Sequence, residues 1–231
     1  LVGSEMCIRD RGKKNQVQAL KSIDLELEQG HNYAIIGKSG SGKSTLMNMI
    51  GLLDLPTEGK IFFKGSDISH YNAGQQAKYR NMEVGFVYQD FRLIDELTAK
   101  ENILLPRLIA KKKIDAVLNA LELSDYRERH PASLSGGQKQ RVTIGVAIVK
   151  DSLVIYFDEP TSGLDYDSMV RVSKLIEQLS DSGVIVFVVS HDFEFIVRTC
   201  TEVVQLDDDG TIQNQQLSPT VLKSLSEKYF T

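Results

Sequence analysis

Residues 32–50, NYAIIGKSGSGKSTLMNMI, join an apolar run to a glycine-rich segment and then to a second apolar run. The first run, 32–36, has the length and composition of a buried strand, and the run that begins at Leu46 favours a helix. Between them, Gly37 to Ser44 follow the pattern G-x-x-x-x-G-K-[ST], which between a strand and a helix indicates a phosphate-binding loop. The alternative interpretation is a plain glycine turn before a helix.

Each residue type in this loop suits phosphate binding. Glycines let successive backbone N–H groups converge on phosphate oxygens, and the N-terminus of the next helix adds a partial positive charge. We expect Lys43 to reach the β- and γ-phosphates, which makes it a catalytic candidate, and the Ser44 hydroxyl to coordinate Mg²⁺. The predicted nucleotide contacts are Gly37, Lys38, Ser39, Gly40, Ser41, Gly42, Lys43, Ser44 and Thr45.

A second apolar run, LVIYFDEP at 153–160, ends in two acidic residues. At the carboxyl end of a buried strand, Asp158 is placed to hold Mg²⁺ through water, and Glu159 to act as the general base on an attacking water. Paired acids after a strand also occur as a solvated turn, but the phosphate loop favours the catalytic interpretation.

The order of the remaining patterns predicts an α/β fold with a mostly parallel core sheet. Strands are expected over 19–27, 59–65, 84–89 and 184–192, and a hairpin over 202–215 with its turn at Asp209-Gly210. Short strands near the N-terminus predict an additional antiparallel β subdomain. Helices are expected over 97–125, 136–150 and 167–181, and from Ser218-Pro219 to the C-terminus.

A third segment, LSGGQKQR at 134–141, places a serine and two glycines at the start of a helix. This arrangement makes a second anion-binding corner, although a simple helix N-cap is the alternative. One nucleotide cannot occupy both this corner and the loop at Gly37 if the two lie far apart in one chain. We therefore predict two chains facing head to tail, each covering the nucleotide of the other.

Together these motifs, in this order, resemble the ATP-binding cassette (ABC) family of transporter ATPases over residues 12–217. The resemblance implies two sandwiched ATP molecules with Mg²⁺ and a P-loop NTPase fold with an inserted helical subdomain at about 90–149. It implies that Gln89 coordinates Mg²⁺, that Asp165 of SGLD (162–165) lies at the dimer interface, and that His191 contacts the γ-phosphate and helps hold Glu159. The implied contacts with the partner's nucleotide are Ser135, Gly136, Gly137 and Gln138.

Composition limits the partners of such a protein. A net charge of −4 argues against nucleic acid. The longest apolar runs fall far short of the roughly 20 residues that span a bilayer. A membrane role would therefore come through a transmembrane permease partner at the cytoplasmic face of the plasma membrane. Two cysteines, Cys7 and Cys200, form no disulfide framework or metal spacing, so a reducing compartment is expected.

Two further hypotheses concern how the chain is assembled. The segment 79–106 resembles macrolide-export and lipoprotein-release cassettes, whereas the sequence from about Lys113 is more similar to energy-coupling-factor cassettes. Either a divergent cassette or two genes joined near 110–113 explains the change. Residues 1–10, LVGSEMCIRD, back-translate to a sequence resembling a transposase-type sequencing adapter, and an adenine-stacking aromatic is expected where Arg9 and Asp10 stand.

Other functions remain open at this point. The cassette could form a homodimer or a heterodimer, and it could signal to a cell-wall hydrolase through a membrane partner instead of moving a solute. A soluble ABC ATPase acting on DNA or the ribosome is a third possibility. Such proteins carry long coiled-coil insertions or two cassettes, whereas only about 60 residues separate Gln89 from Lys150 here. The substrate and the direction of transport are not predicted.

Overall fold

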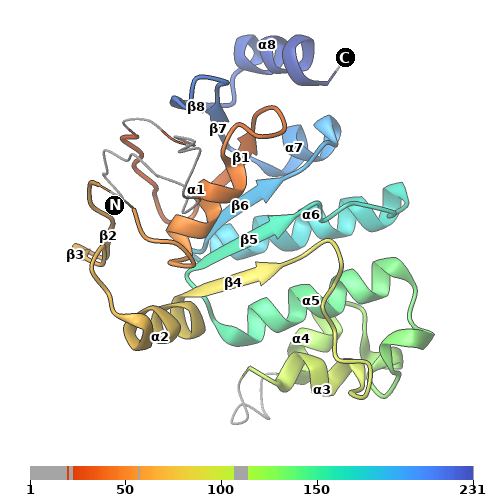
Figure 1. Cartoon of the computed structure of the whole chain (residues 1–231). Helices are drawn as coiled ribbons and strands as arrows, with labels where there is room; N and C mark the ends of the chain where they lie inside the picture. The colour runs from red at the N-terminus through yellow and green to blue at the C-terminus, as the bar shows by residue number, and fades with distance from the viewer. Residues whose placement is uncertain (1–19, 21–22, 57, 107–113, 231) are drawn as a thin grey trace.

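The computed structural model describes residues 20, 23–56, 58–106 and 114–230. Strands and helices alternate along most of this length, as Figure 1 shows. The strands are β1 Asn32–Ile36, β2 Phe62–Phe63, β3 Ser66–Asp67, β4 Val84–Val87, β5 Val154–Asp158, β6 Ile185–Val189, β7 Glu202–Leu206 and β8 Ile212–Gln216. The helices are α1 Lys43–Ile50, α2 Ala73–Glu83, α3 Ala99–Leu104, α4 Ile114–Ala120, α5 Gly136–Lys150, α6 Tyr166–Asp181, α7 Phe193–Thr199 and α8 Pro219–Tyr229, with 3₁₀ turns at Ser124–Tyr126 and Pro131–Ser133.

The core is a six-stranded sheet in the order β4-β5-β6-β1-β7-β8. Every neighbouring pair is parallel except β7 and β8, which form the predicted antiparallel hairpin. A separate two-stranded antiparallel sheet joins β2 to β3. The predicted α/β class with a mostly parallel sheet is therefore confirmed. In such a sheet all parallel strands end at one edge, which is where ligands bind in this fold class.

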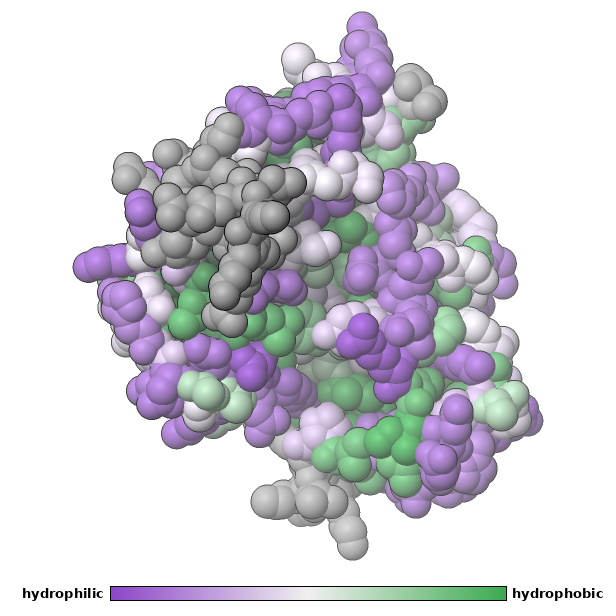
Figure 2. Space-filling model, viewed as in Figure 1, coloured by the Kyte–Doolittle hydropathy of each residue, from purple (hydrophilic) through white to green (hydrophobic). Residues whose placement is uncertain are grey.

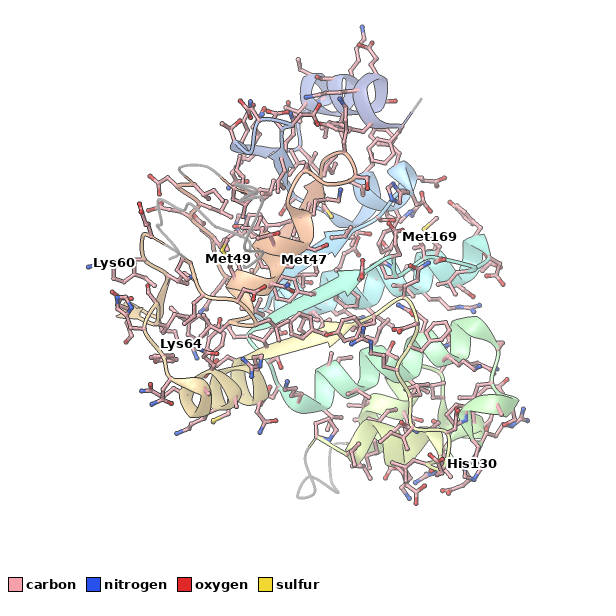
Figure 3. All side chains as sticks on the ribbon, in the orientation of Figure 1. Met47, Met49, Lys60, Lys64, His130 and Met169 are labelled. Carbon is pink, nitrogen blue, oxygen red and sulfur yellow. The ribbon has the colours of Figure 1, made fainter. Side chains whose placement is uncertain are left out.

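Helices cover both faces of this sheet, because the central strands are buried on both sides. Along β5 the side chains alternate between two cores: Ile155 and Phe157 pack with α3 to α7, and Val154 and Tyr156 pack with α1, α2 and the β2–β3 pair. Met49 of α1, labelled in Figure 3, is fully buried in the second core. The phosphate loop and α1 thus stand on a rigid base.

The predicted strand at 19–27 is wrong for the residues that the structure describes. Residues 20 and 23–27 belong to no sheet, although Ile23, Leu25 and Leu27 are buried and Asp24 and Glu26 are exposed. The alternation of apolar and polar residues therefore predicted correctly which side chains are buried. The described residues nevertheless form no strand here. The strand predicted at 59–65 is shortened to β2.

The segment between β4 and β5 is helical, as predicted, but it is not one helix. Within the expected 97–125 range, α3 begins at its N-cap Thr98 with a capping box and ends at Leu104. Helix α4 ends at Ala120, and Glu122 then adopts a left-handed backbone (φ 53°) that no helix can continue. Helix α5 matches the predicted 136–150 bounds. The suggested join at 110–113 and the hypothesis about residues 1–10 fall outside the described residues.

Candidate nucleotide-binding site

Four of the predicted motifs follow four adjacent parallel strands. The phosphate loop comes after β1, His191 after β6, Asp158 and Glu159 at the end of β5, and Gln89 after β4. Because β4, β5, β6 and β1 are consecutive in the sheet, their carboxyl ends place these segments side by side along one edge. The fold thus gathers the loop and its predicted catalytic partners into one site.

The phosphate loop has the backbone that its glycines predict. Gly40 and Gly42 adopt left-handed conformations (φ 84° and 100°), which glycine enters without steric cost. At Gly37 a Cβ would lie 2.4 Å from Ser41 Oγ and 2.7 Å from the backbone oxygen of Leu206, so the loop packs too closely against β7 for any side chain. The loop's shape is therefore fixed by three glycines.

Lys43 folds back over this loop. Its ammonium donates to the backbone oxygens of Gly37 at 2.5 Å and Lys38 at 2.8 Å. Partial burial lowers the pKa of Lys43, and the negative charge of Glu159 acts in the opposite direction. The same lysine is therefore within electrostatic reach of the predicted general base.

The loop also carries groups whose hydrogen-bonding capacity is unused within the described chain. Ser41 Oγ is buried and has no protein partner. Ser44 and Thr45 lie at the first turn of α1, whose N-terminus is left uncapped by any side chain at Gly42. Free N–H groups and hydroxyls at a helix start are donors and ligands suited to phosphate and to Mg²⁺.

Glu159 is held in a strained but well-anchored position. Its backbone is left-handed (φ 48°), and its N–H donates to the Val189 oxygen of β6 at 2.8 Å. Its carboxylate oxygen Oε2 accepts from the backbone N–H of His191 at 3.3 Å and from the Ser190 hydroxyl at 3.5 Å. The His191 ring nitrogen Nε2 stands 3.5 Å from the other oxygen, Oε1. Left-handed backbone in a non-glycine residue is typical of sites where function sets the geometry.

Burial raises the pKa of both acidic residues at the end of β5, Asp158 and Glu159. Desolvation raises the pKa of Glu159, while its hydrogen bond from the His191 backbone works against that rise. Desolvation also raises the pKa of Asp158, and the neighbouring Asp90 carboxylate raises it further, whereas Arg92 lowers it. Raised pKa values favour proton acceptance at neutral pH, which is what a general base needs.

The donor set at this edge fits a magnesium ion bound together with a nucleotide. The side-chain oxygens of Ser44, Asp158 and Gln89 are hard ligands of the kind Mg²⁺ prefers. Among the residues that the structure describes, no three histidine, cysteine or acidic side chains cluster as a complete protein-only metal site. Mg²⁺ usually binds through one or two protein oxygens and the phosphates of its substrate, so this sparse set agrees with that mode.

Sequence reasoning missed two serines at this edge. Ser162 Oγ accepts from the Gln89 amide at 3.2 Å, which ties the segment after β4 to the segment after β5. Ser190 contacts Glu159 as described above. Ser190 directly precedes His191, so its position in VSHD was the only signal available in the sequence. Ser162 belongs to SGLD, where only Asp165 was singled out.

The remaining predicted residues form a second cluster that the fold does not bring to the phosphate loop. Ser135 is the N-cap of α5 and forms a capping box with Gln138. A Cβ at Gly137 would lie 3.4 Å from the side chains of Leu164 and Ser168, near the start of α6. Figure 1 shows α5 beginning well away from the loop between β1 and α1, and Figure 3 shows His130, which precedes this segment, distant from Met47 of α1.

Asp165 and Gly136 of this cluster differ in whether contacts within one chain explain them. Asp165 is the N-cap of α6; its Oδ1 accepts from the Ser168 backbone N–H at 2.7 Å, which lowers the pKa of Asp165. Gly136, in contrast, is exposed, and an added Cβ would meet no atom within 4 Å. Asp165 therefore has a structural role within one chain, whereas nothing in the described residues requires glycine at position 136.

Comparison with known proteins places this arrangement in context. The family model described as "ABC transporter" matches residues 20–162. The lipoprotein-releasing system ATP-binding protein LolD of Aquifex aeolicus is 40% identical over 79% of this chain and 84% of its own length. The macrolide export ATP-binding/permease protein MacB of Acinetobacter baylyi is 36% identical over 91% of this chain, which spans 33% of that relative.

A solved structure shares the fold. The ATP-binding cassette MJ0796, in a dimeric post-hydrolysis state bound to ADP and Pi, superposes with a TM-score of 0.82 at 31% identity, covering 94% of this chain and 99% of the other. No helix in the described part of the chain combines the length and the apolar character needed to cross a membrane. The predicted change of subgroup near 110–113 stays a prediction.

Proposed function

The chain belongs to the ABC transporter family as an ATP-hydrolysing cassette, and we propose that two cassettes close head to tail around two ATP molecules to drive a transmembrane permease. The phosphate loop of one chain would hold the nucleotide, and the Ser135–Gln138 segment of the other would cover it. In this proposal the second cassette is another copy of this chain. The complex would sit at the cytoplasmic face of the plasma membrane.

One observation carries this proposal: the fold keeps the two predicted phosphate-binding segments of the chain apart. The phosphate loop lies at the carboxyl edge of the sheet, and the start of α5 lies in the helical segment. Gly136 is open on its outer side, as expected of a backbone that a ligand approaches from another molecule. The relative MJ0796 is dimeric and bound to ADP and Pi, which supports pairing of two cassettes.

Within the closed pair, the chain's own residues would act on the terminal phosphate. Lys43 and the loop N–H groups would hold the phosphates, and Ser44, Gln89 and Asp158 would hold Mg²⁺, which supplies positive charge to the phosphate oxygens. Glu159 would accept the proton of the attacking water, with His191 contacting the γ-phosphate and holding Glu159 in position. Asp165 would lie at the interface between the two chains.

A groove beside Gln89 is the surface that we assign to the permease. It runs between β4, α3 and α5 and is lined by Phe86, Tyr88, Leu93, Ile94, Leu105 and Val146, among others. Ile94 and Leu105 are 40% and 50% exposed, and Figure 2 shows apolar side chains gathered in this region. A contiguous exposed apolar surface marks an interaction site. By analogy with LolD and MacB, we place this cassette with an export-type or lipoprotein-releasing permease.

The first test is hydrolysis by Glu159→Gln, which keeps the shape of the side chain but removes the base. We expect the rate to fall about 10²–10⁴-fold. A parent-like rate would show that another group accepts the proton.

The shared site has its own test, because the two halves of one site come from different chains. Lys43→Ala damages the loop, and Gly136→Ala damages the covering segment. Lys43→Ala alone should be inactive, and Gly136→Ala alone should be about 10–100-fold slower than the parent. Their mixture forms pairs in which one site combines an intact loop with an intact covering segment, so it should recover hydrolysis. A mixture that stays inactive, with both variants folded, would contradict the head-to-tail arrangement.

A further inference from the structure

The C-terminal helix α8 lies against the phosphate loop, where its last residues wall a pocket. The pocket, of about 210 Å³, is lined on one side by Lys38, Lys43 and His191 and on the other by Lys228, Tyr229 and Phe230. Figure 1 shows α8 above the loop between β1 and α1. Sites that enclose a whole small ligand usually measure roughly 300–1,000 Å³, so this pocket suits the phosphate end of a nucleotide.

The charge of the pocket points to an anion. Its lining includes three lysines and a histidine, and no acidic residue belongs to the described lining. Lys38 and Lys228 lie close enough for the Lys228 ammonium to oppose protonation of Lys38, although Asp208 keeps the pKa of Lys38 raised. Two like charges are thus held near each other beside a loop that binds phosphate.

Carboxylates outside the pocket hold these two lysines. Lys38 Nζ donates to Asp208 at 2.6 Å, and Lys228 Nζ donates to Asp207 at 2.8 Å; both acids lie in the turn between β7 and β8. The Phe230 ring packs on Phe193 at the start of α7, with ring centroids 5.0 Å apart. Because Lys38 and Lys228 are on the surface, each ion pair is worth little and can be exchanged for a more highly charged partner.

We propose that Lys228 contacts the terminal phosphate of bound ATP, which makes α8 the third wall of the nucleotide site. In this arrangement Lys228 leaves Asp207 for a phosphate oxygen across the pocket from Lys43, while Tyr229 and Phe230 limit the access of water. This inference rests on the proposed function, since it assumes that the loop at Gly37–Ser44 binds ATP.

The experiment is titration calorimetry with ATP and with ADP, in EDTA so that ATP is not hydrolysed. Lys228→Ala should weaken ATP binding about tenfold, the size expected for one charge-assisted hydrogen bond. ADP, which lacks the terminal phosphate, should be affected less than twofold, on the order of the variation expected where no contact is lost. Lys228→Arg should restore ATP binding. Lys223→Ala is the matched control, because Lys223 is exposed on the same helix and outside the pocket lining.

Asp207→Asn separates phosphate contact from a purely structural link between α8 and the hairpin. A phosphate contact predicts opposite effects: Lys228→Ala weakens ATP binding, and Asp207→Asn strengthens it by freeing the lysine. A structural link predicts that both variants weaken ATP binding, since both break the same ion pair, and this result would overturn the proposal. Equal affinity in Lys228→Ala and Lys223→Ala would also overturn it. Parent protein that fails to bind ATP would instead refute the proposed function.

Discussion

The substitution Gly136→Ala should reduce ATP hydrolysis by the proposed dimer without reducing the folding stability of the single chain. Gly136 begins α5 with no positive φ, it is exposed, and an added methyl group would touch nothing in the described chain. Alanine inside a helix is favoured over glycine by about 0.5–1 kcal/mol, and less at the first position. The free energy of unfolding of the variant should therefore equal that of the parent or exceed it by up to about 1 kcal/mol.

Hydrolysis should respond quite differently. In the proposed dimer the methyl group projects toward the partner's nucleotide and disturbs one charge-assisted contact, worth about 1.5–3 kcal/mol. The rate should then fall about 10–100-fold. Urea unfolding monitored by circular dichroism gives the stability, and phosphate release under saturating ATP gives the rate.

Gly145→Ala, on the same helix, is the matched control. Its Cβ would lie 2.8 Å from Leu121 and 2.9 Å from Ile103, so it should cost about 1–3 kcal/mol of stability by overpacking. Gly136→Ala with both the stability and the rate of the parent would refute the reasoning, because glycine would then have no purpose at that position. A loss of stability equal to that of Gly145→Ala would show that the added methyl group at position 136 meets other atoms, which contradicts the open space seen in the structure.

Three further outcomes follow from the structure. Because burial raises the pKa of Glu159 and the ionised carboxylate is the active base, kcat should fall as pH decreases through a midpoint above that of an ordinary glutamate; a pH–rate profile with a midpoint at or below about 4.3 would contradict this. Gly37→Ala should lose about 1–3 kcal/mol in urea unfolding together with ATP binding, because its Cβ overlaps Ser41 and Leu206; unchanged ATP affinity in calorimetry would argue against the loop geometry. Burial raises the pKa of the Cys200 thiol, so mass-spectrometric mapping should find the Cys200 peptide alkylated only after unfolding, and rapid native labelling would contradict its burial.

The fold and most of the phosphate site could be predicted because several signals agree there. Apolar strands ended in the motif residues, and parallel strands share a carboxyl edge, so Glu159 was expected near the loop. The position of His191 beside Glu159 was expected only from the resemblance to ABC cassettes. The strand at 19–27 could not be predicted correctly, because alternation reports which side chains are buried and not which backbone groups pair.

Other features depended on contacts between distant segments. Helix α2 is mostly exposed and buries Tyr79 alone, so it lacks the apolar stripe of a core helix; the capping box of Asn72 and Gln75 was its only clear signal. Nothing in the sequence of α8 predicts that Lys228 borders the phosphate loop, because contacts with the distant residues Asp207 and Phe193 hold the end of this segment there.

The central claim is that ATP joins two cassettes through corners that one chain keeps apart. Sedimentation velocity of Glu159→Gln, with and without saturating ATP, tests it most directly. We expect a species of single-chain mass without nucleotide and a species of twice that mass with ATP. A protein that binds ATP and yet sediments as a single chain would contradict it.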